Sequence, residues 1–146
     1  MLLEGKKIIQ FDFNDFGKEY TLVGDRTRIE QVISNLIHNS IKSISRKEDK
    51  EKGQISVTIE QKFGTSAQPI NSSQRLVLIV IEDNGVGVYP NILQSLFTKF
   101  TKSLDGNGLG LYLSKKIVEA HDGKIWAENK VTQKGAKFNV SLPFYG

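Results

Sequence analysis

Apolar side chains recur at three- and four-residue steps in two segments of the chain. In the first, from Thr27 to Ser45, this spacing places the apolar residues on one side of a helix and polar residues on the other. Its apolar positions are Ile29, Val32, Ile33, Leu36, Ile37, Ile41 and Ile44. The second segment follows a glycine-rich stretch, and its apolar face comprises Leu109, Leu113, Ile117 and Ala120. The pattern predicts two amphipathic helices, the second ending at Gly123.

Other segments have the composition and alternation of strands. Gln54–Phe63 alternates apolar and polar residues, and Arg75–Asp83 is a nearly continuous apolar run, typical of a strand buried on both faces. Shorter segments with strand character are Ile8–Phe13, Tyr20–Val23, Lys124–Glu128 and Ala136–Pro143. Gly64–Gln74 has the composition of a loop, and Asn91–Phe97 is long enough for one or two helical turns. This order predicts one α+β domain, a two-layer sandwich with helices on one face of a mixed, mostly antiparallel sheet.

The composition fits one domain, residues 1–146, and excludes several kinds of functional site. The chain is 38% apolar and 25% charged, which suffices for a hydrophobic core. Because no apolar run reaches the roughly 18 residues of a membrane span, we expect a cytoplasmic domain without membrane contact. Cysteine is absent, and His38 and His121 are far apart in sequence, so we expect neither thiol chemistry nor a histidine-built zinc site. The net charge is +4, but acidic residues are interspersed with the basic ones along the chain. We therefore expect no nucleic-acid partner.

Three polar residues of the first predicted helix lie on one stripe. At about 100° per residue, Asn39 is about 40° from Asn35, and Lys42 is about 20° from it on the other side. An ordinary solvated helix face has the same polarity, but asparagine is a weaker helix former than Glu, Lys or Gln. Amide oxygens ligate hard cations, and an ammonium one turn away can meet phosphate oxygens. The stripe is therefore a candidate site for a metal ion and phosphates.

The segment IEDNGVGV places a carboxylate at the end of a buried strand. Asp83 closes the strand, and Gly85 and Gly87 loosen the backbone after it. Asn-Gly is also a common hairpin turn, although Pro90 argues against a strand that returns directly. A carboxylate at the mouth of a sheet, beside glycines that let a flat group approach, could accept the exocyclic amine hydrogen of adenine.

The third candidate is the stretch LFTKFTKSLDGNGLGL, which precedes the second predicted helix. Its glycine spacing matches neither a Walker A loop nor the dinucleotide fingerprint, and alone it is also consistent with a flexible connection. The free N–H groups and positive dipole of a helix that begins here favour an anion. The glycines and nearby cations are Lys99, Lys102, Gly106, Gly108 and Gly110. Together, the three candidates describe a nucleotide site.

These segments, in this order, resemble the ATP-binding catalytic domain of sensor histidine kinases, a GHKL-superfamily domain with the Bergerat fold. Asp25–Ile44 resembles the N box, DNGVG the first glycine box, LFTKF the F box, GNGLGL the second glycine box and GAKFNVSLP the closing strand. The resemblance covers about Asp25 to Pro143 and implies that the domain binds Mg-ATP. It further implies transfer of the γ-phosphate to a histidine on a separate dimerisation and phosphoacceptor domain, with a response regulator downstream in two-component signal transduction.

The resemblance also implies roles for single residues. Asn39 would ligate Mg²⁺, Lys42 would pair with phosphate, and Asp83 would read the adenine amine. Gly85 and Gly87 would shape the base pocket. The ATP lid would run from Lys99 to Asn107, including Lys102, with a hinge at Gly106, and Gly108, Leu109 and Gly110 would close it over the phosphates. Phe97 and Phe100 would anchor the lid or simply pack in the core. Asn35 stands where hydrolysing members carry a glutamate base, so it would help position the phosphate environment without activating water.

Some positions depart from the family pattern. Ser43 stands where many relatives have an aromatic residue against the nucleotide, Lys137 replaces a threonine near the adenine aspartate, and Asn107 replaces a threonine. No stretch resembles the acceptor-histidine hairpin, because His38 lies within the N box and His121 at a helix end. Two alternatives stay open: a non-catalytic nucleotide-sensing or docking module of the same fold, and a stand-alone anti-sigma-type serine kinase.

Overall fold

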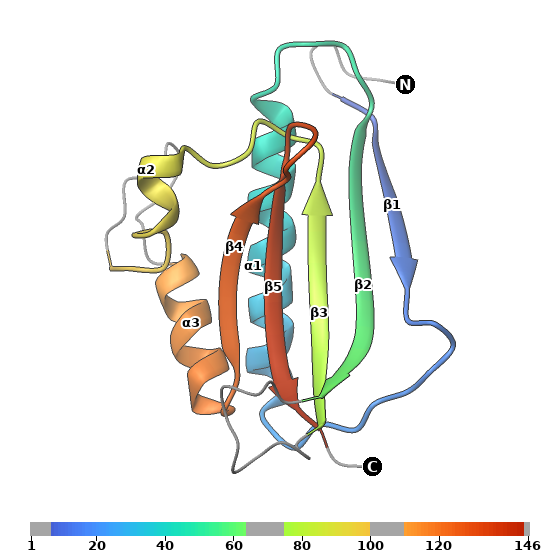
Figure 1. Ribbon diagram of the computed structural model, residues 1–146, viewed down its shortest axis with the longest axis vertical. Helices are drawn as coiled ribbons and strands as arrows, with labels where there is room; N and C mark the ends of the chain where they lie inside the picture. The colour runs from blue at the N-terminus through green and yellow to red at the C-terminus, as the bar shows by residue number, and fades with distance from the viewer. Residues whose placement is uncertain (1–6, 64–74, 100–109, 145–146) are drawn as a thin grey trace.

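A single five-stranded sheet forms the framework of the computed structural model, which describes residues 7–63, 75–99 and 110–144 (Figure 1). The strands are β1 (Ile9–Asn14), β2 (Gly53–Phe63), β3 (Arg75–Asp83), β4 (Lys124–Asn129) and β5 (Ala136–Pro143). Their order across the sheet is β1-β2-β3-β5-β4, and β1 pairs parallel to β2 while the other neighbours pair antiparallel. The helices are α1 (Arg26–Ser45), α2 (Pro90–Leu93) and α3 (Gly110–Ala120). The predicted α+β sandwich with a mixed, mostly antiparallel sheet is confirmed.

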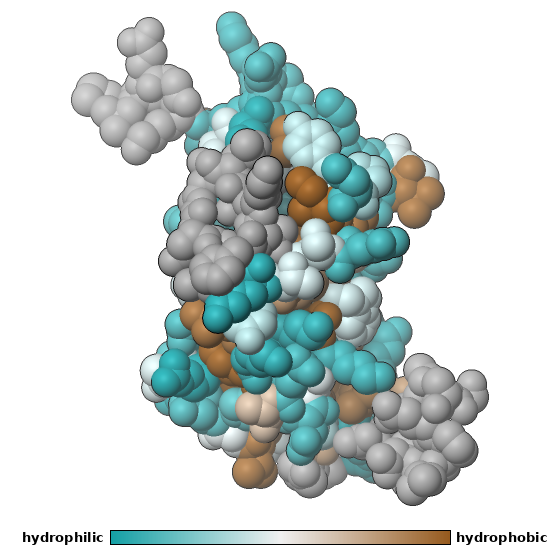
Figure 2. Space-filling view, turned by 90° about the vertical axis from the view of Figure 1, so that its left-hand side faces the viewer, coloured by the Kyte–Doolittle hydropathy of each residue, from teal (hydrophilic) through white to brown (hydrophobic). Residues whose placement is uncertain are grey.

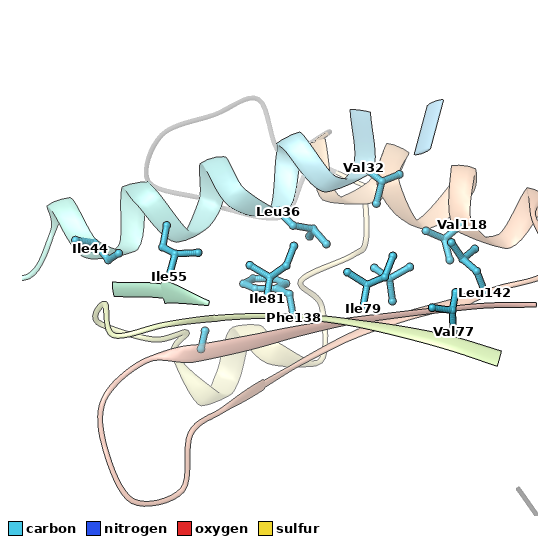
Figure 3. Packing of buried hydrophobic residues seen from close by; sticks show 12 residues of the cluster. Val32, Leu36, Ile44, Ile55, Val77, Ile79, Ile81, Val118, Phe138 and Leu142 are labelled. Atoms are coloured by element: carbon cyan, nitrogen blue, oxygen red, sulfur yellow. The ribbon is translucent and has the colours of Figure 1, made fainter. Parts of the chain in front are cut away.

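The long helix α1 lies against the middle of the sheet, and α3 packs beside it (Figures 1 and 3). Asp25 caps α1, because its side chain accepts a hydrogen bond from the Arg28 N–H at 3.2 Å. Val32 and Leu36 of α1 and Val118 of α3 point toward the strands and are fully buried. Each such side chain stabilises the fold by about 1.5–3 kcal/mol relative to an exposed one. The buried strand residues in this core are Ile55, Val77, Ile79, Ile81, Ala136, Phe138, Val140 and Leu142.

The segment Tyr20–Val23 does not form the predicted strand. Only Thr21 makes an isolated bridge, while Tyr20 packs its ring edge-on against Phe144 with the centroids 5.0 Å apart. Tyr20 and Leu22 pack against the core, and Thr21 is exposed. The alternation of apolar and polar residues therefore comes from a connecting segment that lies along the edge of the core. Such a segment needs no partner strand.

Of the one or two helical turns predicted over Asn91–Phe97, the structure forms one, which begins at Pro90. The helix α2 ends at Leu93, and turns continue the chain.

Seen from the side of α2 and α3, hydrophobic residues are interspersed with hydrophilic ones on the surface (Figure 2). In the described part of the chain, no helix is long and apolar enough to cross a membrane. The predicted loop Gly64–Gln74 lies outside the described residues.

Candidate functional site

Segments that are far apart in sequence meet at one end of the sheet. The end of β3, the C-terminal end of α1 and the turn between β4 and β5 all lie at the upper end of Figure 1. The Val86 N–H donates to the Ser43 carbonyl oxygen at 3.3 Å, which joins the segment after β3 to α1. The Ala136 N–H donates to Asp83 Oδ1 at 3.3 Å, which joins β5 to the same segment.

The carboxylate of Asp83 is buried and only half satisfied. Its residue is 1% exposed, and Oδ1 accepts hydrogen bonds from the N–H groups of Gly85 at 2.8 Å and Ala136. Among the described residues, Oδ2 has no hydrogen-bond partner. Because buried polar atoms are nearly always hydrogen-bonded, Oδ2 is an acceptor suited to a donor on a bound ligand.

Burial raises the pKa of the Asp83 carboxyl group above its ordinary value. The Gly85 N–H, the Ser40 hydroxyl, the Ala136 N–H and the charge of Lys130 oppose this effect. The Ser40 hydroxyl is close enough to favour the charged carboxylate, but its geometry does not make a hydrogen bond. These groups were not predicted from the sequence, because only the fold brings them to Asp83.

The segment after β3 lies directly against the backbone of α1. A Cβ atom at Gly85 would be 2.6 Å from the Ser43 carbonyl carbon and 2.7 Å from the Ile44 nitrogen, so no larger residue fits there without a backbone shift. Ser43 is buried at this contact, and within the described structure its hydroxyl has no hydrogen-bond partner. A small hydroxyl side chain therefore fills the buried contact beside Gly85.

Asn84 holds the same segment to the start of β2. Its Oδ1 accepts a hydrogen bond from the Gln54 N–H at 2.7 Å, and its Nδ2 donates to the Lys52 carbonyl oxygen at 2.9 Å. Both ends of the amide are used, so Asn84 fixes the segment directly after Asp83. The Asp-Asn-Gly sequence signals a turn, but the partners of Asn84 lie about thirty residues earlier and were not predicted.

The polar stripe of α1 is half-buried on the same helix that contacts the segment after β3. Asn39 donates from Nδ2 to the Asn35 carbonyl oxygen at 2.9 Å, and the amide oxygen Oδ1 is the other end of this side chain. Asn35 donates to Ser114 Oγ of α3 at 3.3 Å, so its side chain links the two helices. Lys42 lies one turn further along and is also half-buried. An amide oxygen and an ammonium group in this order fit a hard cation and phosphate oxygens.

A metal ion at this site would depend on few protein ligands. In the described ranges, no group of three or more His, Cys, Asp or Glu residues could hold a metal. The Oδ1 atom of Asn39 is a suitable oxygen ligand, but one protein oxygen leaves most of the coordination to other groups. A Mg²⁺ ion that keeps waters and phosphate oxygens as its remaining ligands fits this donor set.

The glycine-rich candidate falls largely outside the described residues. Gly110 is the first residue of α3 and is exposed, and Lys99 is also exposed. Phe97 packs against the core, as expected for a residue that anchors the following segment. The predicted lid residues outside the described ranges are Phe100, Lys102, Gly106, Asn107, Gly108 and Leu109.

The expected position of Lys137 beside the adenine-reading carboxylate is wrong. Lys137 pairs in register with Glu82, and its Nζ lies 3.1 Å from Glu82 Oε1. Since neighbouring strand residues point to opposite faces, Lys137 faces away from the side chain of Asp83. The β5 residue that contacts Asp83 is Ala136, through its backbone N–H.

Comparisons with known proteins agree with this geometry. Residues 24–146 match the family described as "Histidine kinase-, DNA gyrase B-, and HSP90-like ATPase". The chain is 33% identical over 142 residues to hybrid signal transduction histidine kinase D of Dictyostelium discoideum, covering 84% of this chain and 9% of that protein. It is 30% identical over 127 residues to sensor histidine kinase WalK of Bacillus subtilis strain 168, covering 82% of this chain and 18% of that protein. The chain therefore spans a small part of these relatives.

Solved structures show the same architecture. The catalytic domain of histidine kinase ThkA has a TM-score of 0.72 and 29% identity, with 92% of this chain and 80% of that chain covered. The mycobacterial sensor histidine kinase MprB has a TM-score of 0.73 at 23% identity, covering 93% of this chain and 82% of that chain, which supports the fold. The resemblance to histidine kinase catalytic domains is thus confirmed, and the chain belongs to the histidine kinase-, DNA gyrase B- and HSP90-like ATPase family.

Proposed function

We propose that residues 1–146 form one catalytic domain that binds Mg-ATP and donates the γ-phosphate to a histidine of a separate dimerisation and phosphoacceptor domain. The bond between the γ-phosphorus and the β–γ bridging oxygen breaks, a bond to a ring nitrogen of the acceptor forms, and ADP leaves. A response regulator then receives the phosphoryl group from the histidine. Support comes from the family match and from relatives that are sensor histidine kinases.

The observation that carries the proposal is that Oδ2 of Asp83 has no hydrogen-bond partner in the part of the chain that the structure describes. This buried acceptor matches the exocyclic amine of adenine, which donates hydrogen bonds. Oδ1 is already held by two backbone N–H groups, so the carboxylate is oriented before a base binds. Gly85 and Gly87 follow it and would line the space beside the base.

The phosphates would lie over the polar stripe of α1. Asn39 would hold Mg²⁺ through Oδ1, and Lys42 would pair with a phosphate oxygen. When bound, Mg²⁺ supplies positive charge that offsets the charge of the phosphates. The predicted lid from Lys99 to Asn107, with Lys102 and the hinge Gly106, would cover them, closed by Gly108, Leu109 and Gly110.

Asn35 is consistent with a kinase that conserves its ATP. An amide cannot take a proton from water, so Asn35 cannot act as a general base for hydrolysis. Its Nδ2 is instead directed at Ser114 of α3, near the start of the helix after the predicted lid. Slow hydrolysis would preserve the γ-phosphate until the acceptor histidine arrives.

A direct test combines binding and phosphoryl transfer. Mg²⁺ with a nonhydrolysable ATP analogue is expected to raise the melting temperature of the domain, whereas the GTP analogue is not. Labelled phosphate should then pass from ATP to a histidine-containing acceptor domain supplied in trans. No shift with the ATP analogue would overturn the proposal.

The transfer assay also separates the alternatives. Binding without transfer to any acceptor domain would favour a nucleotide-sensing or docking module, and acid-stable phosphoserine on a partner would favour a serine kinase. One argument for the docking module was that Lys137 alters the nucleotide site. This argument is weaker because Lys137 pairs with Glu82, away from the Asp83 side chain.

A further inference from the structure

The side chain of Asn129, at the end of β4, is bonded to the segment that follows Asp83. The Val88 N–H donates to Asn129 Oδ1 at 2.8 Å, and Asn129 Nδ2 donates to the Val88 carbonyl oxygen at 2.6 Å. The amide thus satisfies both backbone groups of one residue that is 41 positions earlier in the chain. A side chain here does what a neighbouring strand does elsewhere in a sheet.

The contact with Asn129 extends to Gly87. This glycine has a φ of +79°, and a Cβ atom there would lie 2.9 Å from Asn129 Oδ1. A side chain at Gly87 would therefore be strained by its backbone and would also crowd the amide. The glycine that would lie beside the base and the amide that holds Val88 occupy adjoining space.

Asn129 completes a set of contacts along the segment from Asp83 to Val88. Asn84 ties its beginning to β2, Gly85 rests on α1, and Asn129 ties its end to β4. Of these three contacts, only the one made by Asn129 joins the segment to the β4–β5 side of the sheet. On that side the Ala136 N–H also donates to Asp83. Removing the amide would leave the part-buried peptide groups of Val88 without these partners and would free the end of the segment.

We propose that Asn129 is a positioning residue for the base end of the nucleotide site, acting through Val88 and Gly87. This inference rests on the proposed function, since it assigns to Asn129 the task of holding the glycines where adenine binds. It predicts that the loss of Asn129 weakens binding of the adenosine part of ATP and spares binding of the phosphates.

The test compares Asn129→Ala with Asn139→Ala in the same domain. Asn139 lies on β5, is buried, and donates to Glu128 Oε1 of β4 at 3.3 Å. Its side chain points to the sheet face opposite that of Phe138 and Val140. Asn139 is therefore a control asparagine that links β5 to β4 and lies away from the segment after Asp83. Melting temperatures without ligand report the structural cost of each change.

Calorimetric titration at a temperature where all variants are folded reports the binding. We expect Asn129→Ala to weaken both adenosine and Mg-ATP by about tenfold, the scale of one or two lost hydrogen bonds, and Asn139→Ala to change neither by more than about twofold. Inorganic triphosphate with Mg²⁺ should bind Asn129→Ala as it binds the wild type.

Equal weakening of Mg-ATP by the two variants, or equal weakening of adenosine and triphosphate by Asn129→Ala, would overturn the inference and assign Asn129 a purely structural role. Wild-type affinity of Asn129→Ala for adenosine would also overturn it. In each of these cases the wild type still binds Mg-ATP, so the proposed function stands. Failure of the wild type to bind Mg-ATP would instead contradict the proposed function.

Discussion

The two ends of the proposed site differ in burial. At the base end, the carboxylate of Asp83 is buried and the segment after it is held by hydrogen bonds. At the phosphate end, the polar side chains of α1 are half-exposed. Asp83 is 1% exposed, and the segment after it is tied to β2, α1 and β4. Asn39 and Lys42 project from α1, and most of the predicted lid lies outside the described residues.

The difference indicates how each end would gain specificity. A buried carboxylate with one free oxygen discriminates sharply, because a ligand without a matching donor leaves that oxygen unpaired. Half-exposed amide and ammonium groups bind charged ligands with less strict requirements on geometry. A metal ion and several phosphate oxygens can therefore bind there together. Base recognition should therefore depend on the folded sheet, and phosphate binding on individual side chains of α1.

The largest expected effect comes from Asp83→Asn at the base end. An asparagine can keep the two backbone hydrogen bonds at Oδ1 but presents an N–H donor where the adenine amine needs an acceptor. We expect Mg-ATP affinity to fall by about 100-fold or more, with no loss of thermal stability. Titration calorimetry and a melting curve check this pair of outcomes. Retained affinity would show that Asp83 does not read the base.

At the phosphate end, Asn39→Ala should remove mainly the magnesium-dependent part of binding. Alanine favours the helix, so the melting temperature should not fall by much despite the loss of the hydrogen bond to Asn35. We expect Mg-ATP to weaken by about tenfold, the lower end of what metal-site substitutions cost, while ATP without Mg²⁺ changes little. The same titrations on Asp83→Asn are the control, because that change should weaken ATP with and without Mg²⁺.

An Asn35→Glu change tests whether the amide suppresses hydrolysis. Glutamate can accept a proton from water at this position. We expect ATP turnover by the isolated domain to rise by about 100-fold, the low end of general-base catalysis, because Ser114 also constrains the side chain. Asn35→Gln has the same length without a base and should not raise turnover. Equal rates in the two variants would contradict the assignment.

The pH dependence should differ in sign between stability and binding. Burial raises the pKa of Asp83 in the folded state, so its contribution to the free energy of unfolding is fully present below the unfolded pKa and is lost as pH rises through the folded value. Relative to Asp83→Asn, the wild type should therefore gain stability as pH falls from neutral, whereas its affinity for ATP should fall. Denaturant unfolding and titrations of both proteins across this range check the two trends.

The smallest effect is expected for Lys137→Gln, outside both ends. The ion pair with Glu82 is about one-third exposed on both sides, so its loss should change the free energy of unfolding by less than about 1 kcal/mol. Affinity for Mg-ATP should not change. A clear loss of affinity would place Lys137 in functional contact with the base end, against its position on the other face.

Local patterns predicted most elements closely, because burial periodicity is a property of consecutive residues. The spacing predicts a helix over Thr27–Ser45, and α1 spans Arg26–Ser45; the apolar run Arg75–Asp83 coincides with β3. The same reasoning failed at Tyr20–Val23, where a connection alternates between core and solvent without a partner strand. The predicted roles of the site residues remain predictions until binding is measured.

The sequence by itself determined the fold class and the chemical types available at the site, since these follow from periodicity and residue identity. Its resemblance to known motifs indicated the family. Only the tertiary structure decided which groups share a space. It put Ala136 and Lys130 beside Asp83, turned Lys137 to the opposite face and brought Asn129 to Val88. The physical reason is that a strand's register and face decide which side chains meet, and pairing between distant segments sets both.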